Sequence, residues 1–207
     1  MLNALGLKKK KTPEQLVRLA CTALDDGNGE ALQKRLGQMK AVLYGDEEKD
    51  PDPERCQELS AAMRQSGLMP RLIEKFAGLP FEARKDVAQV FNNLVRKNVG
   101  GFVEYVEKDA PMIKGMIEAY GNPDIALLCG QMLRECIRYE GLARMVLYDQ
   151  LLWLFFDKYV HLPNFDVASD AFATLRDLLT RNKQASSASF LEERFNEVFE
   201  RYTELLK

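Results

Sequence analysis

Apolar residues recur along almost the whole chain with the spacing of an amphipathic helix, and no segment alternates polar and apolar residues for long enough to predict a strand. In the first such segment, Leu16, Leu19 and Ala23 share one helix face. Residues 12–15 (Thr-Pro-Glu-Gln) mark its start, because they form a capping box with proline at the first helical position. Cap-then-proline pairs recur at 52–53 and 122–123. The pattern predicts an all-α fold.

A repeated motif divides the helical pattern into units. Asp-Val-Ala or Asp-Ile-Ala begins three segments, at Asp86, Asp124 and Asp166, which lie 38 and 42 residues apart. Each Asp is followed ten positions later by an arginine, and residues 52–64 are interpreted as a degenerate earlier copy. A period near 40 is typical of HEAT and armadillo arrays. The sequence therefore predicts a short armadillo/HEAT-like helical-repeat solenoid, a right-handed superhelix, over residues 12–207, after a basic N-terminal tail of residues 1–11.

In such an array, the helix carrying each motif is expected to come last in its unit and to line the concave surface. Positions three, six, seven and ten after each Asp share one side of that helix, and the opposite side forms the core between repeats. The side chains predicted to contact a partner are Gln89, Asn92, Asn93, Arg96, Gln131, Arg134, Ser169 and Arg176. The same positions also hold Leu127, Gly130, Phe172 and Ala173.

Two features of this strip allow alternative interpretations. The guanidiniums of Arg96, Arg134 and Arg176 either bond the last carbonyls of their own helices and offset the helix dipole, or form a row of forks for carboxylate or phosphate groups of a partner. These two interpretations are compatible. Phe165, at the start of the third motif helix, is either a hydrophobic staple or an exposed contact at the concave rim.

The composition does not favour an enzyme or a nucleic-acid-binding protein. The chain has 29 basic and 31 acidic residues and a net charge of −2, whereas nucleic-acid binders usually carry a basic excess. His161 is the only histidine and is expected to cap helix carbonyls. No Walker, GxGxxG, GxSxG or HExxH motif occurs. We predict no catalytic residue, no cofactor and no metal.

The cysteines and the charge runs are given structural interpretations. No CxxC pair occurs, so inert free thiols in a reducing, cytoplasmic compartment are expected for Cys21, Cys56, Cys129 and Cys136. The acidic run 46–54 fails as an EF-hand, because its sixth position is Pro51 rather than glycine. Residues 8–11, all lysine, are interpreted as a solvated tail, with weak attraction to acidic lipid or nucleic acid as the alternative. No stretch approaches the ~20 apolar residues of a membrane span.

Five stretches resemble the calcium-binding protein 39 family, also called the mouse protein 25-like scaffolds. They are residues 11–14 (KTPE), 39–45 (MKAVLYG), 85–94 (KDVAQVFNNL), 125–138 (IALLCGQMLRECIR) and 165–175 (FDVASDAFATL). The resemblance implies an armadillo-like scaffold without catalytic activity, whose concave face binds protein kinases of the germinal-centre (sterile-twenty) group and a related pseudokinase in a closed, active-like conformation. By motif, Phe165 matches the family's kinase-touching phenylalanine, and the polar strip matches its kinase-facing surface.

We therefore expect a non-enzymatic scaffold that activates a kinase allosterically through differential binding. The alternatives are a nucleic-acid-binding helical repeat, a general protein-interaction module, and an enzyme built from carboxylates alone. Family chains usually continue through further repeats, which hold a pocket for the pseudokinase tail. This sequence stops after an apolar stripe in residues 190–206, and truncation, self-association and a partner are the interpretations of that stripe.

Overall fold

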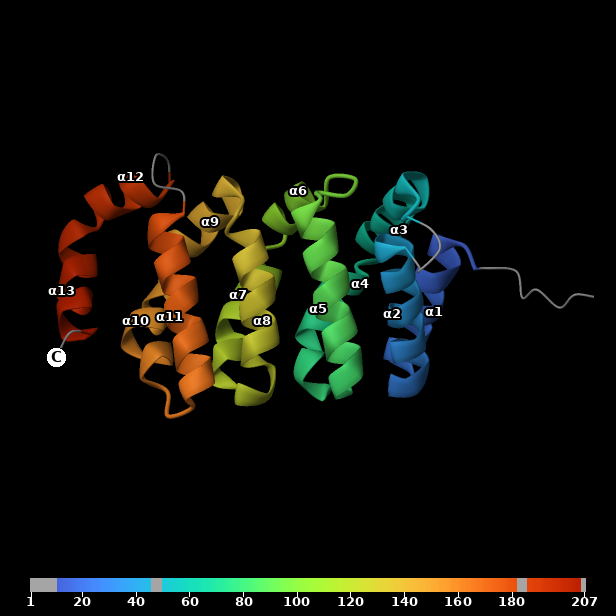
Figure 1. The fold of residues 1–207 in the computed structure, drawn as a ribbon, viewed down its shortest axis with the longest axis horizontal. Coiled ribbons are helices and arrows are strands. Elements are labelled where there is room, and N and C mark those ends of the chain that lie inside the picture. The colour runs from blue at the N-terminus through green and yellow to red at the C-terminus, as the bar shows by residue number, and fades with distance from the viewer. Residues whose placement is uncertain (1–10, 46–49, 182–185, 206–207) are drawn as a thin grey trace, which may run out of the picture.

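The computed structural model describes residues 11–45, 50–181 and 186–205, and every regular element within these ranges is a helix. Thirteen α-helices and four short 3-10 helices follow one another along the longest axis of the molecule (Figure 1). The all-α helical-repeat fold predicted from the sequence is confirmed.

The array is built from three-helix units with a flanking pair at each end. The first pair is α1 (Pro13–Asp25) and α2 (Gly29–Tyr44). The three units are α3 (Pro53–Ser66), α4 (Leu68–Glu74) and α5 (Phe81–Arg96); α6 (Phe102–Glu107), α7 (Ala110–Glu118) and α8 (Pro123–Cys136); and α9 (Glu140–Leu147), α10 (Trp153–Asp157) and α11 (Phe165–Thr180). The last pair is α12 (Ser186–Glu193) and α13 (Phe195–Leu205). The 3-10 helices are η1 (Phe76–Gly78), η2 (Ala119–Gly121), η3 (Gln150–Leu152) and η4 (Tyr159–His161).

Corresponding helices of successive units stack in rows. Helices α2, α5, α8 and α11 form one row, in which each helix packs on the next and all four run in the same direction (Figure 1). We call these four the ladder helices. Helices α3, α6, α9 and α12 form a second row along one edge, and α1, α4, α7, α10 and α13 belong to a third behind the ladder. Extensive contacts therefore join only neighbours in the array, as in other helical repeats.

The repeat period is confirmed, but two details of the expected register are wrong. Helices α5, α8 and α11 begin at Phe81, Pro123 and Phe165, which are 42 positions apart. The motif aspartates Asp124 and Asp166 are the second residues of their helices, whereas Asp86 is the sixth residue of α5. Residues 52–64 are not an earlier ladder copy either. They lie at α3, in a different row, and the ladder helix before α5 is α2.

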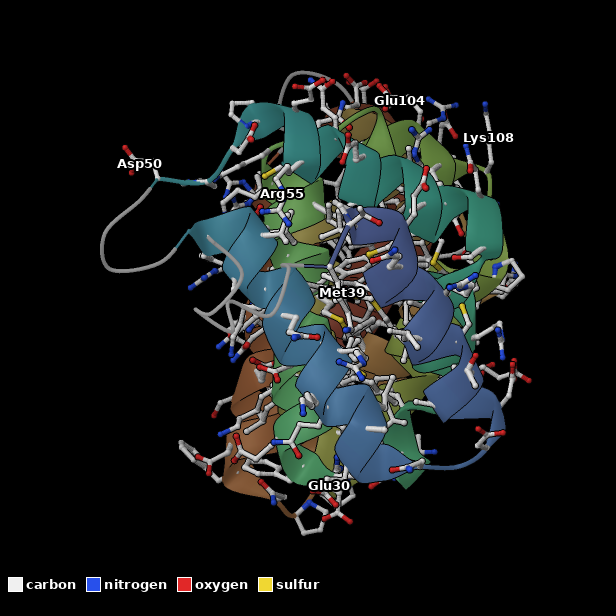
Figure 2. All side chains as sticks on the ribbon, turned by 90° about the vertical axis from the view of Figure 1, so that its right-hand side faces the viewer. Glu30, Met39, Asp50, Arg55, Glu104 and Lys108 are labelled. Atoms are coloured by element: carbon white, nitrogen blue, oxygen red, sulfur yellow. The ribbon has the colours of Figure 1, made fainter. Side chains whose placement is uncertain are left out.

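Local signals and burial explain why the rows form. The capping box at the start of α1 is present, since the hydroxyl of Thr12 accepts from the Gln15 N–H and the Gln15 side chain accepts from the Thr12 N–H. Figure 2 shows the end of the array that carries α1 and α2, with Met39, which is fully buried, between these two helices. Farther along, the ring of Tyr120 in the second unit packs with those of Phe155 and Tyr159 in the third. Burying one such side chain contributes about 1.5–3 kcal/mol, so the stacked interfaces carry most of the stability.

Two carboxylates, the buried Asp86 and the half-buried Asp170, link ladder helices at the same position. Asp86 is the sixth residue of α5 and pairs with Lys40 of α2 at 2.5 Å. Asp170 is the sixth residue of α11 and pairs with Arg134 of α8 at 2.6 Å. The corresponding position of α8 holds Leu128, which is uncharged. At the sixth helical position, basic side chains thus reach forward to carboxylates at two of the three ladder junctions.

The α8–α11 link extends into a network of four side chains. The hydroxyl of Tyr120 donates to Asp170 at 2.8 Å and lies 2.8 Å from the hydroxyl of Thr174. Arg134 also donates to Thr174 at 2.9 Å. Burial raises the pKa of Tyr120 well above its ordinary range, with the Asp170 charge adding to the effect, so the phenol stays protonated as the donor.

Gly130 lies against this network. A Cβ at Gly130 would meet the carboxylate of Asp170 and the hydroxyl of Tyr120 too closely for either to stay in place. Gly37 on α2 differs, because the nearest atom to its Cβ would be Asp86 Oδ2 at 3.8 Å, an ordinary contact. Glycine is therefore required sterically at one helical position and not at the other.

We predict that Gly130→Ala lowers the free energy of unfolding by about 1–3 kcal/mol, although alanine is the better helix former, because it displaces Asp170 and Tyr120. Gly37→Ala is the matched control and should raise that free energy by up to about 1 kcal/mol. Urea unfolding followed by circular dichroism measures both. A Gly130→Ala protein as stable as the unmodified chain would show that the network tolerates displacement.

Candidate partner-binding face

The outer surface of the four ladder helices, here called the ladder face, carries most of the residues predicted to bind a partner. Five of the eight polar ones are exposed, namely Gln89, Arg96, Gln131, Ser169 and Arg176. The exposed large apolar side chains of these helices are Tyr44, Phe81, Leu127, Phe165 and Phe172. The face therefore combines aromatic rings with amide, hydroxyl and guanidinium groups.

The other three predicted polar residues lie in or toward the interior. Asn93 is only 4% exposed, and its amide nitrogen donates to the Leu43 carbonyl of α2, so its placement on the strip is wrong. Arg134 is half-buried in the network with Asp170 and is a structural link. Asn92 is half-buried, and its Oδ1 has no hydrogen-bond partner among the described residues. These three positions hold ladder helices together or fill space between them.

The predicted row of three arginines combines two different positions of the repeat. Arg134 and Arg176 are the twelfth residues of α8 and α11, but Arg96 is the sixteenth residue of α5. The twelfth residue of α5 is Asn92, and the position that corresponds to Arg96 is held by Arg138, just after α8. The cause is the same as for Asp86, because α5 begins one turn earlier relative to its motif than α8 and α11 do.

None of the three predicted arginines bonds the last carbonyls of its own helix, so that part of the interpretation is wrong, although Arg96 and Arg134 do lie in the last turns of their helices, where they offset the helix dipole. Arg96 donates to Glu135 of α8 at 2.6 Å, and Arg176 donates to Asp177 at 3.2 Å. Glu135 and Asp177 are each the thirteenth residue of their helices, as Asn93 is in α5. The guanidiniums therefore bond carboxylates rather than helix ends.

The side chain of Glu135 is held between two arginines. It accepts from Arg96 and from Arg138, the latter at 3.2 Å, and it is only 15% exposed. Burial alone would raise the pKa of Glu135, but the hydrogen bonds and charges of the two guanidiniums outweigh burial, and the pKa lies below its ordinary value. The same interaction raises the pKa of Arg96. The pair is ionised at neutral pH and joins α5 to α8.

Phe165 is 80% exposed at the first residue of α11, so the hydrophobic-staple interpretation is wrong, and its role as a contact residue stays a prediction. Phe81 is 58% exposed at the first residue of α5, the equivalent position two units earlier. The sequence analysis did not identify Phe81, although it precedes Phe165 by two 42-residue periods. Both rings lie at the N-terminal edge of the ladder face.

The contribution of α2 to the face was also missed, because this helix lacks the aspartate motif. The hydroxyl of Tyr44 donates to the Gln89 carbonyl of α5 at 3.1 Å. Beside it lies a depression of about 400 Å³ between the two helices, lined by Gly37, Lys40, Ala41, Tyr44, Gly45 and Gln89. The depression has room for a small side chain of a partner.

Groups that could support other chemistry are few. Burial raises the pKa of the Cys129 thiol to about 12, and the four cysteines are unpaired. His161 Nε2 lies 3.0 Å from the Phe156 carbonyl near the end of α10, as expected for a capping role. Among residues with a described position, no three His, Cys, Asp or Glu side chains could hold a metal ion together. Residues 46–49 of the acidic run, and Lys8, Lys9 and Lys10, lie outside the described residues.

Within the described ranges, no helix is both long and apolar enough to cross a membrane.

Comparison with known proteins identifies the family to which this helical array belongs. The sequence model of the family described as Mo25-like matches residues 5–207. The chain belongs to the Mo25-like family. Relatives include the human calcium-binding protein 39-like protein, 40% identical over 97% of this chain and 62% of that protein. MO25-like protein 2 of Caenorhabditis elegans is 36% identical over 99% of this chain and 65% of that protein. The Mo25-like protein of Schizosaccharomyces pombe is 31% identical over 97% of this chain and 64% of that protein.

The chain therefore spans about two thirds of the length of these Mo25-like relatives. The protein is a scaffold-type member of the Mo25-like family.

We predict that the coupling between Arg96 and Glu135 disappears on acidification. A carboxylate whose pKa is lowered in the folded state contributes stability above its unfolded pKa, near 4.5, and loses it as the pH falls through the lower folded value. A double-mutant cycle with Arg96→Gln and Glu135→Gln should give about 0.5–1 kcal/mol at neutral pH. The coupling free energy is measured by thermal unfolding of the unmodified chain, the two single variants and the double variant between pH 7 and pH 3. A coupling that is the same at pH 7 and pH 3 would exclude an ionised pair.

Proposed function

We propose that this chain is a scaffold whose ladder face binds a protein kinase or pseudokinase domain of the sterile-twenty group and favours its active conformation. The observation that carries the proposal is the 80% exposure of Phe165 on the ladder face of a Mo25-like chain. By the family resemblance, Phe165 is the phenylalanine that touches a bound kinase. A location in the cytoplasm is part of the proposal, supported by the four free cysteines.

The chemistry around Phe165 suits a protein partner. A phenylalanine left 80% in water gains free energy when a partner covers it, and exposed aromatic residues commonly dominate protein interfaces. Ser169 and Phe172 follow on the same side of α11, at helical spacing, and both are exposed. An apolar anchor beside hydroxyl groups and arginines is the usual composition of such a site.

Activation would follow from differential binding. A rigid array that makes more contacts with the closed kinase than with the open one shifts the kinase population toward the closed state. The affinity of the scaffold and the activity of the kinase are then linked, because each state has its own free energy of binding. The stacked rows of helices supply the rigidity that this mechanism requires.

Self-association through α13 is a second proposed contact, as expected from the apolar stripe of residues 190–206. Phe195, Phe199 and Tyr202 are 53%, 48% and 44% exposed on this helix, while Leu206 lies outside the described residues. Contiguous exposed aromatic surface favours association. We predict a concentration-dependent increase in mass by light scattering that Phe199→Ser abolishes; a chain that stays monomeric at every concentration would exclude this contact.

We predict that the chain binds at least one sterile-twenty group kinase domain and raises its turnover. Phe165→Ala should weaken binding by about tenfold or more, because it removes an aromatic anchor, and Arg176→Glu should weaken it through the charge change. The matched controls are Phe195→Ala on α13 and Arg18→Glu on α1, both exposed and outside the ladder face. Affinity and turnover are measured in one titration for each protein.

The outcomes separate the parts of the proposal. Binding without a change in turnover would exclude activation and leave a scaffold. Equal effects of the substitutions on and off the ladder face would place the contact elsewhere. Failure to bind any kinase domain of the group would overturn the proposal for this chain.

A further inference from the structure

Arginines and carboxylates alternate across the C-terminal ends of three ladder helices. Glu135 of α8 accepts from Arg96 of α5 at 2.6 Å and from Arg138 at 3.2 Å. One unit later, Asp177 of α11 accepts from Arg176 at 3.2 Å and from Arg181 at 3.0 Å. The two carboxylates lie at equivalent positions in two units, and each is shared by two guanidiniums, although the arginines come from different positions.

The carboxylates lie beneath the arginines. The side chains of Glu135 and Asp177 are 15% and 14% exposed, whereas those of the four arginines are 44–63% exposed. A guanidinium has five N–H donors, so a bond to the carboxylate below leaves donors for a ligand above. The carboxylates also hold the arginines in place, which reduces the entropy that a ligand must overcome to bind them.

The charge on this edge is positive. Four arginines and the exposed Lys97 outnumber the two shared carboxylates, although the whole chain has a net charge of −2. The opposite edge of the ladder face carries Glu82, Asp124 and Asp166 in the first turns of α5, α8 and α11, and Lys85, which pairs with Glu82, and Arg84 offset part of this charge. The C-terminal edge is therefore the more positive of the two.

We propose that Arg96, Arg138, Arg176 and Arg181 form a binding edge for an acidic segment of the protein partner. This inference rests on the proposed function, since the partner is the protein held on the ladder face. Carboxylates of such a segment accept hydrogen bonds from the outward N–H donors of the paired arginines. Both groups are charged, so these charge-assisted hydrogen bonds are the strongest contacts available there. A kinase domain seated on Phe165 would be oriented by this edge.

The ligand is an acidic protein segment rather than a nucleic acid. A nucleic acid brings a long run of phosphates and needs an extended basic surface to neutralise them. Here the paired arginines are confined to one edge, and the carboxylates in the first turns of α8 and α11 leave no continuous basic surface for a polyanion that crosses the face. A short acidic stretch of a protein needs only the two pairs of arginines.

The test uses the full chain and a fluorescein-labelled hexaglutamate peptide, with binding followed by anisotropy at low salt. The variant Arg138→Gln/Arg181→Gln removes one arginine from each pair and leaves Arg96 and Arg176 on the buried carboxylates, so the fold is kept. The control is Arg18→Gln on α1. We expect the double variant to bind the peptide at least about fivefold more weakly, the control to bind as the unmodified chain does, and hexaglutamine not to bind.

Two results would overturn the inference. One is that hexaglutamate does not bind, or binds the double variant as tightly as the unmodified chain, while circular dichroism shows that all the proteins are folded. The other is a single-stranded oligonucleotide of the same charge binding more tightly than the peptide through the same arginines, which would assign the edge to nucleic acid. The peptide experiment does not use the kinase. If the unmodified chain binds the kinase but not the peptide, only this inference fails. If it binds the peptide but not the kinase, only the proposed function fails.

Discussion

Each three-helix unit of this chain has apolar surface on both of the sides that face its neighbours, and only another unit can cover it. The ladder helices form a continuous row of such contacts, since α2, α5, α8 and α11 pack one on the next along the array. Within that interface, Asp86 and Asp170 are carboxylates paired with basic side chains of the preceding ladder helix. A buried charge is costly unless it is paired. These pairs therefore favour one register of each helix on its neighbour.

That register also determines what the ladder face presents. Gly130 lets the side chains of Asp170 and Tyr120 approach α8 closely, and this close packing sets the position of α11. The exposed side of α11 carries Phe165, Ser169 and Phe172, so the position of this helix determines where they lie. The side of the helix that holds the array together and the side offered to a partner are thus two faces of one rigid element. A change in the buried network would move the exposed residues without touching them.

Much of this arrangement was predictable from sequence, because it depends on local signals. The period and the capping box at Thr12 follow from cap chemistry and helical spacing, whereas for Phe165 a staple and an exposed contact were both open. The register within each unit was not predictable, because α5 begins five residues before Asp86, whereas α8 and α11 begin one residue before their motif aspartates. The error carried over to Asn93, which faces a neighbouring helix. Arg134 lies at the same position as Arg176, and it turns inward because Asp170 of α11 pairs with it. Helix α2 and the partnerships of Glu135 depend on contacts between units, which no local pattern encodes.

The restriction of contacts to neighbours has a consequence for how the molecule opens. Hydrogen bonds between ladder helices join residues 36 to 50 positions apart, and among the residues whose positions are described, no extensive contact ties one end of the array to the other. Detaching a terminal unit breaks one interface, whereas opening a central unit breaks two, so fraying proceeds inward from the ends. The backbone amides of α5 and α8 are then the slowest to exchange with solvent. The middle of the array is therefore the part that opens least often. Its ends are the places where a new interface can form with the smallest loss of existing contacts.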